Sequence, residues 1–240
     1  ADLIPRHSCV ITVSNTGYIK RVPSDTYRTQ HRGGKGIIGM ETKEEDYVEH
    51  LFNADSHDLI FFFTDRGFMY WLNVYEIPEG SRTGKGRAIT NMIKVEPGEK
   101  ICAMLTVRQE EFDDPNKYIV MASRRGFIKK SELALFKNLR RVGLRALVIE
   151  EDDDLIGAGI SENGNEILLS TKFGMACLFD QDDDQIRPMG RTARGVTGMR
   201  FKIEGDSVVS LEIIREHLYE EPAEDEEGED EEAALRIGRK

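Results

Sequence analysis

Residues that could hold a phosphate-bearing ligand stand together in one short run, Gln30-His31-Arg32-Gly33-Gly34-Lys35-Gly36. Glycines let a backbone turn sharply and expose its N–H groups, and such groups bind anions when cationic side chains flank them. The run lacks the spacing of a nucleotide-binding P-loop and the hydroxyl residue that follows its lysine. By itself this run is as typical of an ordinary surface turn as of an anion-binding site. Its interpretation therefore depends on whether the same chemistry recurs.

The same chemistry recurs three times farther along the chain. Four glycines, each at the end of an apolar run, are followed at a nearly constant distance by a second glycine that lies among cations. The pairs are Gly17 and Gly36, Gly67 and Gly86, Gly126 and Gly143, and Gly174 and Gly195. Solvated turns would carry charges of mixed sign, so four basic loops in register favour a nucleic-acid backbone as the ligand.

The candidate DNA-binding residues are the cations and close-approach residues of these four loops. They are Gln30, His31, Arg32, Gly33, Gly34, Lys35, Gly36, Arg82, Lys85, Arg87, Arg140, Arg141, Arg145, Arg191 and Arg194. A second rank follows the turn glycines, namely Lys20, Arg21, Lys129 and Lys130. For this second rank, plain solvated charge is an equally good interpretation.

The elements that must position these loops form a repeat of about fifty residues. Each unit begins with four or five β-forming residues, then Ser or Thr, two variable residues, a glycine and further apolar residues, as in 59–70. A glycine between two β-rich runs is typical of a hairpin, because the tight turn needs a positive φ. After the basic loop, each unit adds an apolar strand, an acidic turn and a last strand. Four strands per unit is the number in a propeller blade.

The sequence therefore predicts an all-β fold, a β-pinwheel or propeller-like repeat of four-stranded blades. About four blades are expected, over residues 9–58, 59–117, 118–165 and 166–215, arranged as an open arc or a truncated ring. Residues 1–215 would form the DNA-binding domain, with the basic loops on one edge and the acidic turns elsewhere.

The net charge of −11 comes from one segment. Residues 216–232 contain eleven Asp or Glu and no Lys or Arg, so the remainder of the chain sums to zero. Overall acidity thus does not argue against nucleic acid, and residues 216–240 are expected to form an acidic, disordered linker or tail. Two interpretations of this segment stay open, a competitor of DNA for the basic loops and a solubilising linker.

Residues typical of other functions are absent or isolated. Cys9, Cys102 and Cys177 are far apart and form no Cys-x-x-Cys pair, which indicates buried cysteines in a cytosolic protein. The histidines have no carboxylate or cysteine partner at a site-like spacing, and no apolar run reaches the roughly 18 residues of a membrane span. We therefore expect no catalytic residue, metal site or cofactor on this chain.

On these residues, 9 to about 214 resemble the C-terminal domain of the A subunit of DNA gyrase, a type IIA DNA topoisomerase. That family is a six-bladed β-pinwheel that wraps DNA around its rim, and its first blade carries the box Gln-Arg-Arg-Gly-Gly-Arg-Gly. Gln30, Arg32, Gly33, Gly34 and Gly36 match the box, whereas His31 and Lys35 replace arginine. Lysine keeps the charge but loses bidentate phosphate geometry, and histidine is mostly neutral at pH 7.

The resemblance implies a partial domain, about four of the six blades, that binds and wraps DNA without sequence specificity. The parent would be a bacterial, cytoplasmic and nucleoid-associated isomerase, an A2B2 assembly of the A and B subunits of gyrase. Such an enzyme introduces negative supercoils with ATP bound on its partner subunit, and its tyrosine nucleophile lies upstream of this domain.

Three alternatives remain at this point. The chain could be the equivalent domain of topoisomerase IV, in which the box is degraded. It could be a protein-interaction propeller whose basic edge is incidental, which predicts little salt dependence and no change in DNA topology. A propeller enzyme would need inward-pointing carboxylate pairs, which the repeat does not show.

Overall fold

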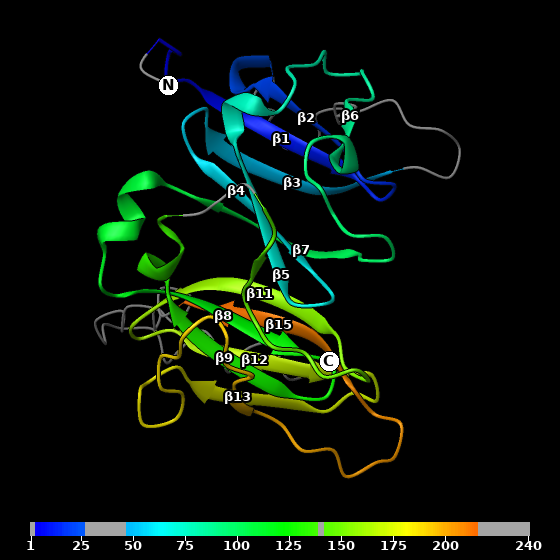
Figure 1. Cartoon of the computed structure of the whole chain (residues 1–240), viewed down its shortest axis with the longest axis vertical. Helices are drawn as coiled ribbons and strands as arrows, with labels where there is room; N and C mark the ends of the chain where they lie inside the picture. Colours follow the sequence, from blue (N-terminus) through cyan, green and yellow to red (C-terminus); the bar gives the residue numbers. More distant parts are fainter. Residues whose placement is uncertain (1–2, 27–46, 139–141, 216–240) are drawn as a thin grey trace, which may run out of the picture.

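The computed structural model describes residues 3–26, 47–138 and 142–215. Within them the chain forms antiparallel sheets and short 3-10 helices, with no α-helix. Four sheets follow one another along the molecule (Figure 1), each built around a hairpin of one repeat unit. The predicted all-β repeat of blades is confirmed.

The strands of the first two units are β1 (Ser8–Ser14), β2 (Tyr18–Pro23), β3 (Val48–Asp55), β4 (Leu59–Thr64), β5 (Phe68–Asn73), β6 (Arg87–Ala88) and β7 (Ile101–Val107). Those of the last two are β8 (Lys117–Ser123), β9 (Phe127–Glu132), β10 (Leu144–Arg145), β11 (Leu155–Glu162), β12 (Glu166–Thr171), β13 (Ala176–Asp180), β14 (Val196–Thr197) and β15 (Val208–Ile214). The 3-10 helices are η1 (Ser24–Thr26), η2 (Val74–Glu76), η3 (Ile89–Asn91), η4 (Gln109–Asp113) and η5 (Leu133–Phe136).

The repeated Ser/Thr-x-x-Gly pattern makes the four hairpin turns. Gly17, Gly67, Gly126 and Gly174 all have φ between +77° and +87°, a conformation that glycine adopts without steric cost. The hydroxyl residue accepts a hydrogen bond from the residue after each glycine, as Ser14 Oγ does from Tyr18 N at 3.2 Å. Thr64, Ser123 and Thr171 repeat this contact in the other three turns. The turn is therefore fixed by a hydroxyl residue and a glycine at constant spacing.

The fourth strand of each complete sheet comes from the following unit. Strand β6 pairs with β2, β10 with β5 and β14 with β9, so the sheet orders are β3-β1-β2-β6, β10-β5-β4-β7 and β11-β8-β9-β14. In the described residues the last sheet has three strands, β13-β12-β15. The predicted number of strands per sheet is right for the first three, but the expectation that each unit supplies all four is wrong. These exchanged strands have two residues each, and the apolar run after β6 forms η3 instead.

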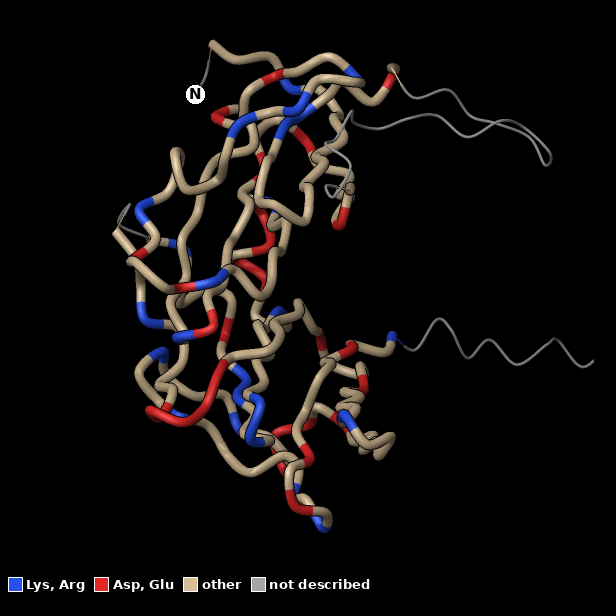
Figure 2. Tube along the Cα trace, turned by 90° about the vertical axis from the view of Figure 1, so that its right-hand side faces the viewer, with Lys and Arg blue, Asp and Glu red and all other residues tan. Residues whose placement is uncertain are grey.

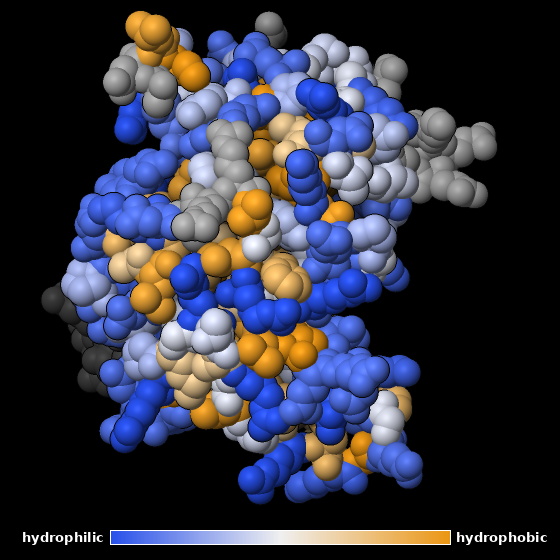
Figure 3. Space-filling view, in the orientation of Figure 1, coloured by the Kyte–Doolittle hydropathy of each residue, from blue (hydrophilic) through white to orange (hydrophobic). Residues whose placement is uncertain are grey.

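The hydrophobic core lies between successive sheets. On β4, Ile60 and Phe62 face a cluster shared with the first sheet, whereas Phe61 and Phe63 face one shared with the third. A third cluster joins the last two sheets. A central strand buried on both faces explains why these runs are continuously apolar rather than alternating. Most of the face seen in Figure 3 is hydrophilic, and hydrophobic side chains gather toward its middle.

The sheets share an inner and an outer edge. Strand β11 packs against both β7 and β15, so the last strands of the second, third and fourth units lie side by side, and we call this side of the sheets the inner edge. The exchanged strands β6, β10 and β14 occupy the opposite edge of their sheets. We call the row formed by these three strands and the segments leading into them the outer edge.

Candidate nucleic-acid interface

Two basic loops on the outer edge have the same conformation. Loop 80–86 lies along β2, with Gly80 N donating to Arg21 O, and loop 190–195 lies along β9 just after Met189 N donates to Lys130 O. Inside each loop one turn is closed by an equivalent bond, from Gly84 N to Ser81 O and from Ala193 N to Gly190 O, both at 3.2 Å. The register places Arg82 and Arg191 at one shared position, and Lys85 and Arg194 at another.

A cation of each loop stacks on an aromatic ring of the preceding unit. The ammonium of Lys85 lies 3.8 Å from the ring centroid of Tyr18, and the guanidinium of Arg194 lies 4.3 Å from that of Phe127. In the second sheet Arg145 lies 4.3 Å from the ring of Phe68. Each aromatic residue directly follows a turn glycine, a recurrence in the sequence that the prediction of site residues did not use. Cation–π contact holds these charges in place while leaving N–H groups for a ligand.

The described candidates are accessible to solvent. Arg82, Arg87 and Arg194 are exposed, and Lys85, Arg145 and Arg191 are half-buried. All six lie on the outer edge, in or beside the exchanged strands of three successive sheets. The remaining candidates, Gln30, His31, Arg32, Gly33, Gly34, Lys35, Gly36, Arg140 and Arg141, lie outside the described residues.

The second-rank candidates are not a cationic surface. Lys20, Lys129 and Lys130 have no exposed area, and their ammonium groups donate to backbone carbonyls or to Asp183. The half-buried Arg21 donates to Ile77 O and pairs with Glu79 at 3.0 Å. Both interpretations of the three lysines from the sequence, DNA contact and solvated charge, are wrong, because each lysine is covered by a segment of the next unit.

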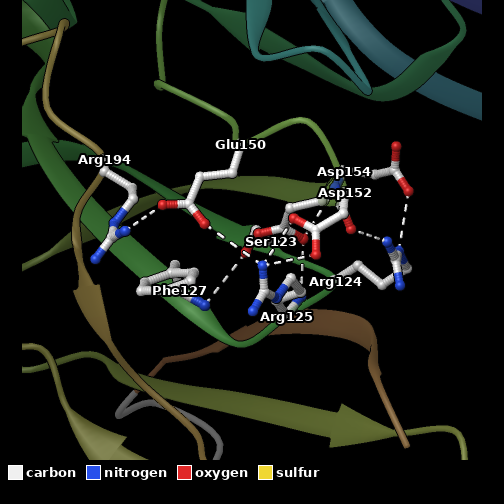
Figure 4. Close-up of polar contacts among 9 residues, drawn as sticks. Ser123, Arg124, Arg125, Phe127, Glu150, Asp152, Asp154 and Arg194 are labelled. Atoms are coloured by element: carbon white, nitrogen blue, oxygen red, sulfur yellow. Dashed lines mark hydrogen bonds and ion pairs between the residues drawn. The ribbon is translucent and has the colours of Figure 1, made fainter. Parts of the chain in front are cut away.

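One acidic turn lies beside the cations instead of away from them. Glu150 pairs with Arg194, and with Arg125 at 3.4 Å (Figure 4). In the same turn Asp152 accepts from Arg125 at 2.7 Å, and Asp154 accepts from Arg124 at 2.9 Å. Figure 2 likewise shows acidic and basic residues interspersed along the body. The expected separation of acidic turns from basic loops is therefore wrong here, and an anion that binds Arg194 must compete with a carboxylate.

Replacing Glu150 by glutamine should strengthen binding of a polyanion at the outer edge. The change removes one negative charge beside Arg194 and Arg125 without altering side-chain size. A phosphate then no longer competes with a carboxylate for the two guanidinium groups. We expect duplex DNA to bind about 2- to 5-fold more tightly at low salt, with the gain fading as salt screens exposed charges. Fluorescence anisotropy at several salt concentrations measures this.

Glu162→Gln is the matched control. Glu162 lies on the inner strand β11 and pairs with Lys117 at 2.8 Å, and this contact lowers the pKa of the carboxyl group. The same charge change should leave DNA affinity within about 2-fold, since it lies away from the outer edge. Equal gains from both variants would show that only net charge matters.

Nothing in the described part of the chain forms a cluster of three or more His, Cys, Asp or Glu residues that could hold a metal ion. Burial raises the pKa of Cys102 to about 12 and that of Cys9 to about 11, which keeps both thiols protonated and unreactive. No described helix is long and apolar enough to span a membrane.

The sheets follow an arc, exchange their outer strands and carry cations at matching positions. These features define a propeller-like class of nucleic-acid-binding module. The family described as "DNA gyrase C-terminal domain, beta-propeller" matches this chain four times, over residues 10–55, 58–108, 117–162 and 165–215. These four matches coincide with the four repeat units. The chain belongs to this family.

Full-length relatives agree with this assignment. The chain is 41% identical over 218 residues to the A subunit of DNA gyrase from Mycobacterium tuberculosis, a match that covers 91% of this chain and 26% of that protein. It is 42% identical over 197 residues to the A subunit of DNA gyrase from Clostridium acetobutylicum, covering 82% and 23%. The chain thus spans about a quarter of the length of the curated relatives it matches.

Solved structures resemble the fold. The C-terminal domain of DNA topoisomerase IV gives a TM-score of 0.72 at 27% identity, covering 88% of this chain and 62% of that one. The C-terminal domain of DNA gyrase A gives 0.65 at 25% identity, covering 85% and 64%. The partial coverage agrees with the expectation of a partial domain.

Proposed function

We propose that this domain binds double-stranded DNA without regard to base sequence and wraps it along the outer edge. The observation that carries the proposal is that a cation lies over the aromatic ring after the turn glycine in three successive sheets, Lys85 on Tyr18, Arg145 on Phe68 and Arg194 on Phe127. A row of charges held at equivalent rings can follow one phosphate backbone as it curves. Membership in the gyrase C-terminal family supports the same ligand.

The free energy needed to bend DNA is better supplied by phosphate contacts than by readout of base edges. Bending 20–30 bp of DNA by 40–90° costs on the order of 1–6 kcal/mol. The described residues contain no α-helix that could enter the major groove, so direct reading of base edges lacks its usual element. Lys and Arg contacts to phosphates supply non-specific affinity, with a log–log salt slope near −0.9 for each neutralised phosphate. A few such contacts on each sheet are enough to offset the bend.

The parent would be the A subunit of gyrase rather than its topoisomerase IV counterpart. The 41% and 42% identities to the two gyrase relatives and the match of Gln30, Arg32, Gly33, Gly34 and Gly36 to the gyrase box support this choice. In that setting the domain acts within an A2B2 assembly with the B subunit in the bacterial cytoplasm, at the nucleoid. It supports ATP-dependent negative supercoiling and carries no catalytic residue itself.

The proposal also covers segments outside the described residues. Gln30–Gly36, Arg140 and Arg141 would add contacts to the same row, because Arg32-Gly33-Gly34-Lys35-Gly36 has the spacing of Arg82-Thr83-Gly84-Lys85-Gly86. Residues 1–215 would form the binding domain, and residues 216–240 an acidic linker or tail.

Ligation of nicked circular DNA in the presence of the domain tests both binding and wrapping. A wrap of positive handedness should leave closed circles with a raised linking number after the protein is removed, in proportion to the amount bound. An unchanged linking number at saturating protein would overturn wrapping. Affinity that hardly changes between about 50 and 200 mM salt would overturn phosphate binding and favour a protein-interaction propeller.

A further inference from the structure

Two buried lysines bind the backbone of the two equivalent basic loops. The ammonium of Lys20 donates to the backbone carbonyls of Ser81, Arg82 and Gly84 at 2.9, 2.5 and 2.8 Å. Lys20 lies on β2 of the first sheet, whereas these carbonyls belong to the second unit. All three N–H donors of the ammonium are therefore used by one loop of a different unit.

Lys129 makes the same arrangement in the third sheet. Its ammonium donates to Gly190 O at 3.1 Å, to Arg191 O at 2.8 Å and to Ala146 O. Gly190 and Arg191 occupy the loop positions of Ser81 and Arg82, so two of the three carbonyls are equivalent. A contact that occurs twice, at matching positions of separate units, is a property of the repeat rather than an accident of one loop.

The unit between them supplies an internal comparison. The position of Lys20 and Lys129 is held there by Tyr70, whose hydroxyl donates to Glu99 at 3.1 Å. The ring of Tyr70 packs against Gly143, where an added Cβ would lie 2.7 Å from the ring. Gly143, just before β10, is thus contacted by a ring at this position.

Each loop is shaped around its lysine. A Cβ at Gly80 would lie 3.2 Å from Cδ of Lys20, and a Cβ at Gly86 would lie 3.1 Å from its Cβ. Carbonyls that point inward to the ammonium direct the intervening side chains away from the sheet, and Arg82 is exposed while its own carbonyl is bound. The buried ammonium of Lys20 therefore determines that the side chain of Arg82 points outward.

We propose that Lys20 and Lys129 are positioning residues, each of which fixes the backbone of the DNA-binding loop supplied by the next unit. The loop-fixing part stands on the contacts above, and its effect on DNA rests on the proposed function. Burial, followed by the charge of Arg191, lowers the pKa of Lys129 to about 8, so its ammonium keeps all three donors at about pH 6.5.

Lys20→Met and Lys129→Met test the inference, because methionine keeps the apolar stem and removes the three donors. Amide hydrogen exchange of the DNA-free domain should speed up at least about tenfold for Gly84 in the first variant and for Ala193 in the second, each without effect on the other loop. Lys130→Met is the matched control, since its buried ammonium binds Gln181 O and Asp183 instead. It should leave both loops unchanged.

A measurement on the unaltered protein covers the case in which a variant fails to fold. Ammonium protons held by three carbonyls exchange slowly with water, so ¹⁵N-lysine spectra at about pH 6.5 should show slowly exchanging Nζ signals for Lys20 and Lys129. Rapid exchange of both ammonium groups would overturn the inference, as would unchanged loop exchange in both folded variants.

DNA affinity separates this inference from the proposed function. If both hold, Lys20→Met weakens duplex DNA binding about 5- to 20-fold and flattens its salt slope, although Arg82 and Lys85 are still present. If the loops loosen in the variants but the unaltered domain does not bind DNA, the positioning role stands and the proposed function fails.

Discussion

Replacing Arg82 and Arg191 together by glutamine should lower the affinity for duplex DNA by about 100-fold at roughly 0.1 M salt. The two residues occupy equivalent positions on separate sheets, so one duplex following the outer edge would meet both. A charge-assisted contact is worth about 1.5 kcal/mol or more, roughly tenfold in affinity for each residue. The log–log salt slope should become shallower by about 1.8, which is about 0.9 for each lost contact. Titrations over a range of salt concentrations measure both quantities.

Lys100→Gln with Arg108→Gln makes the same change in charge on the other side of the sheet. Both residues are exposed, and they flank the inner strand β7. This control should weaken binding no more than about 3-fold and leave the slope nearly unchanged, because charges beyond a Debye length are screened. Equal losses from the two pairs would mean that DNA does not follow the outer edge.

Gly195→Ala should destabilise the domain by roughly 3 kcal/mol or more and should also weaken DNA binding. Gly195 has φ +97°, and a Cβ there would lie 2.3 Å from the carbonyl oxygen of Ile128. Relieving this clash moves the loop away from β9 and breaks the pairing of Val196 with Ile128. Urea unfolding gives the loss of stability, and anisotropy gives the loss of affinity.

Gly174→Ala separates the clash from the backbone strain. Gly174 has φ +85°, and nothing lies within 4 Å of a Cβ built there. Alanine at this turn should cost only about 1 kcal/mol, the usual penalty of a left-handed conformation. DNA affinity should stay the same. If the two variants lost equal stability, the close approach of loop 190–195 to β9 would be disproved.

The sequence predicted the hairpins because their chemistry is local. Ser14 and Gly17, like their equivalents in the other units, make the turn by contacts within four residues. The exchange of the outer strand was not predictable in the same way. Two paired residues, such as Arg87 and Ala88, leave no periodic pattern, and their partners on β2 belong to the preceding unit.

Some cations are buried and bound to backbone carbonyls, whereas others are accessible to solvent. Residue type alone does not show to which group a cation belongs. Lys20 and Arg82 carry the same charge, yet one is fully buried and the other is exposed. What decides is the neighbouring unit, whose loop covers Lys20 with carbonyl groups. Glu150 is similar, because its pairing with Arg194 joins residues 44 positions apart.

Strand exchange also dictates where the chain can be divided. A single sheet excised at the ends of its own unit would lose its outer strand and expose the N–H and C=O groups of β2 or β9 to other chains, which invites edge-to-edge aggregation. A truncation that keeps its last sheet whole must run past the following basic loop, to residue 88, 145 or 197. Adjacent sheets are consequently interlocked, and they should unfold together in one cooperative transition rather than independently of one another.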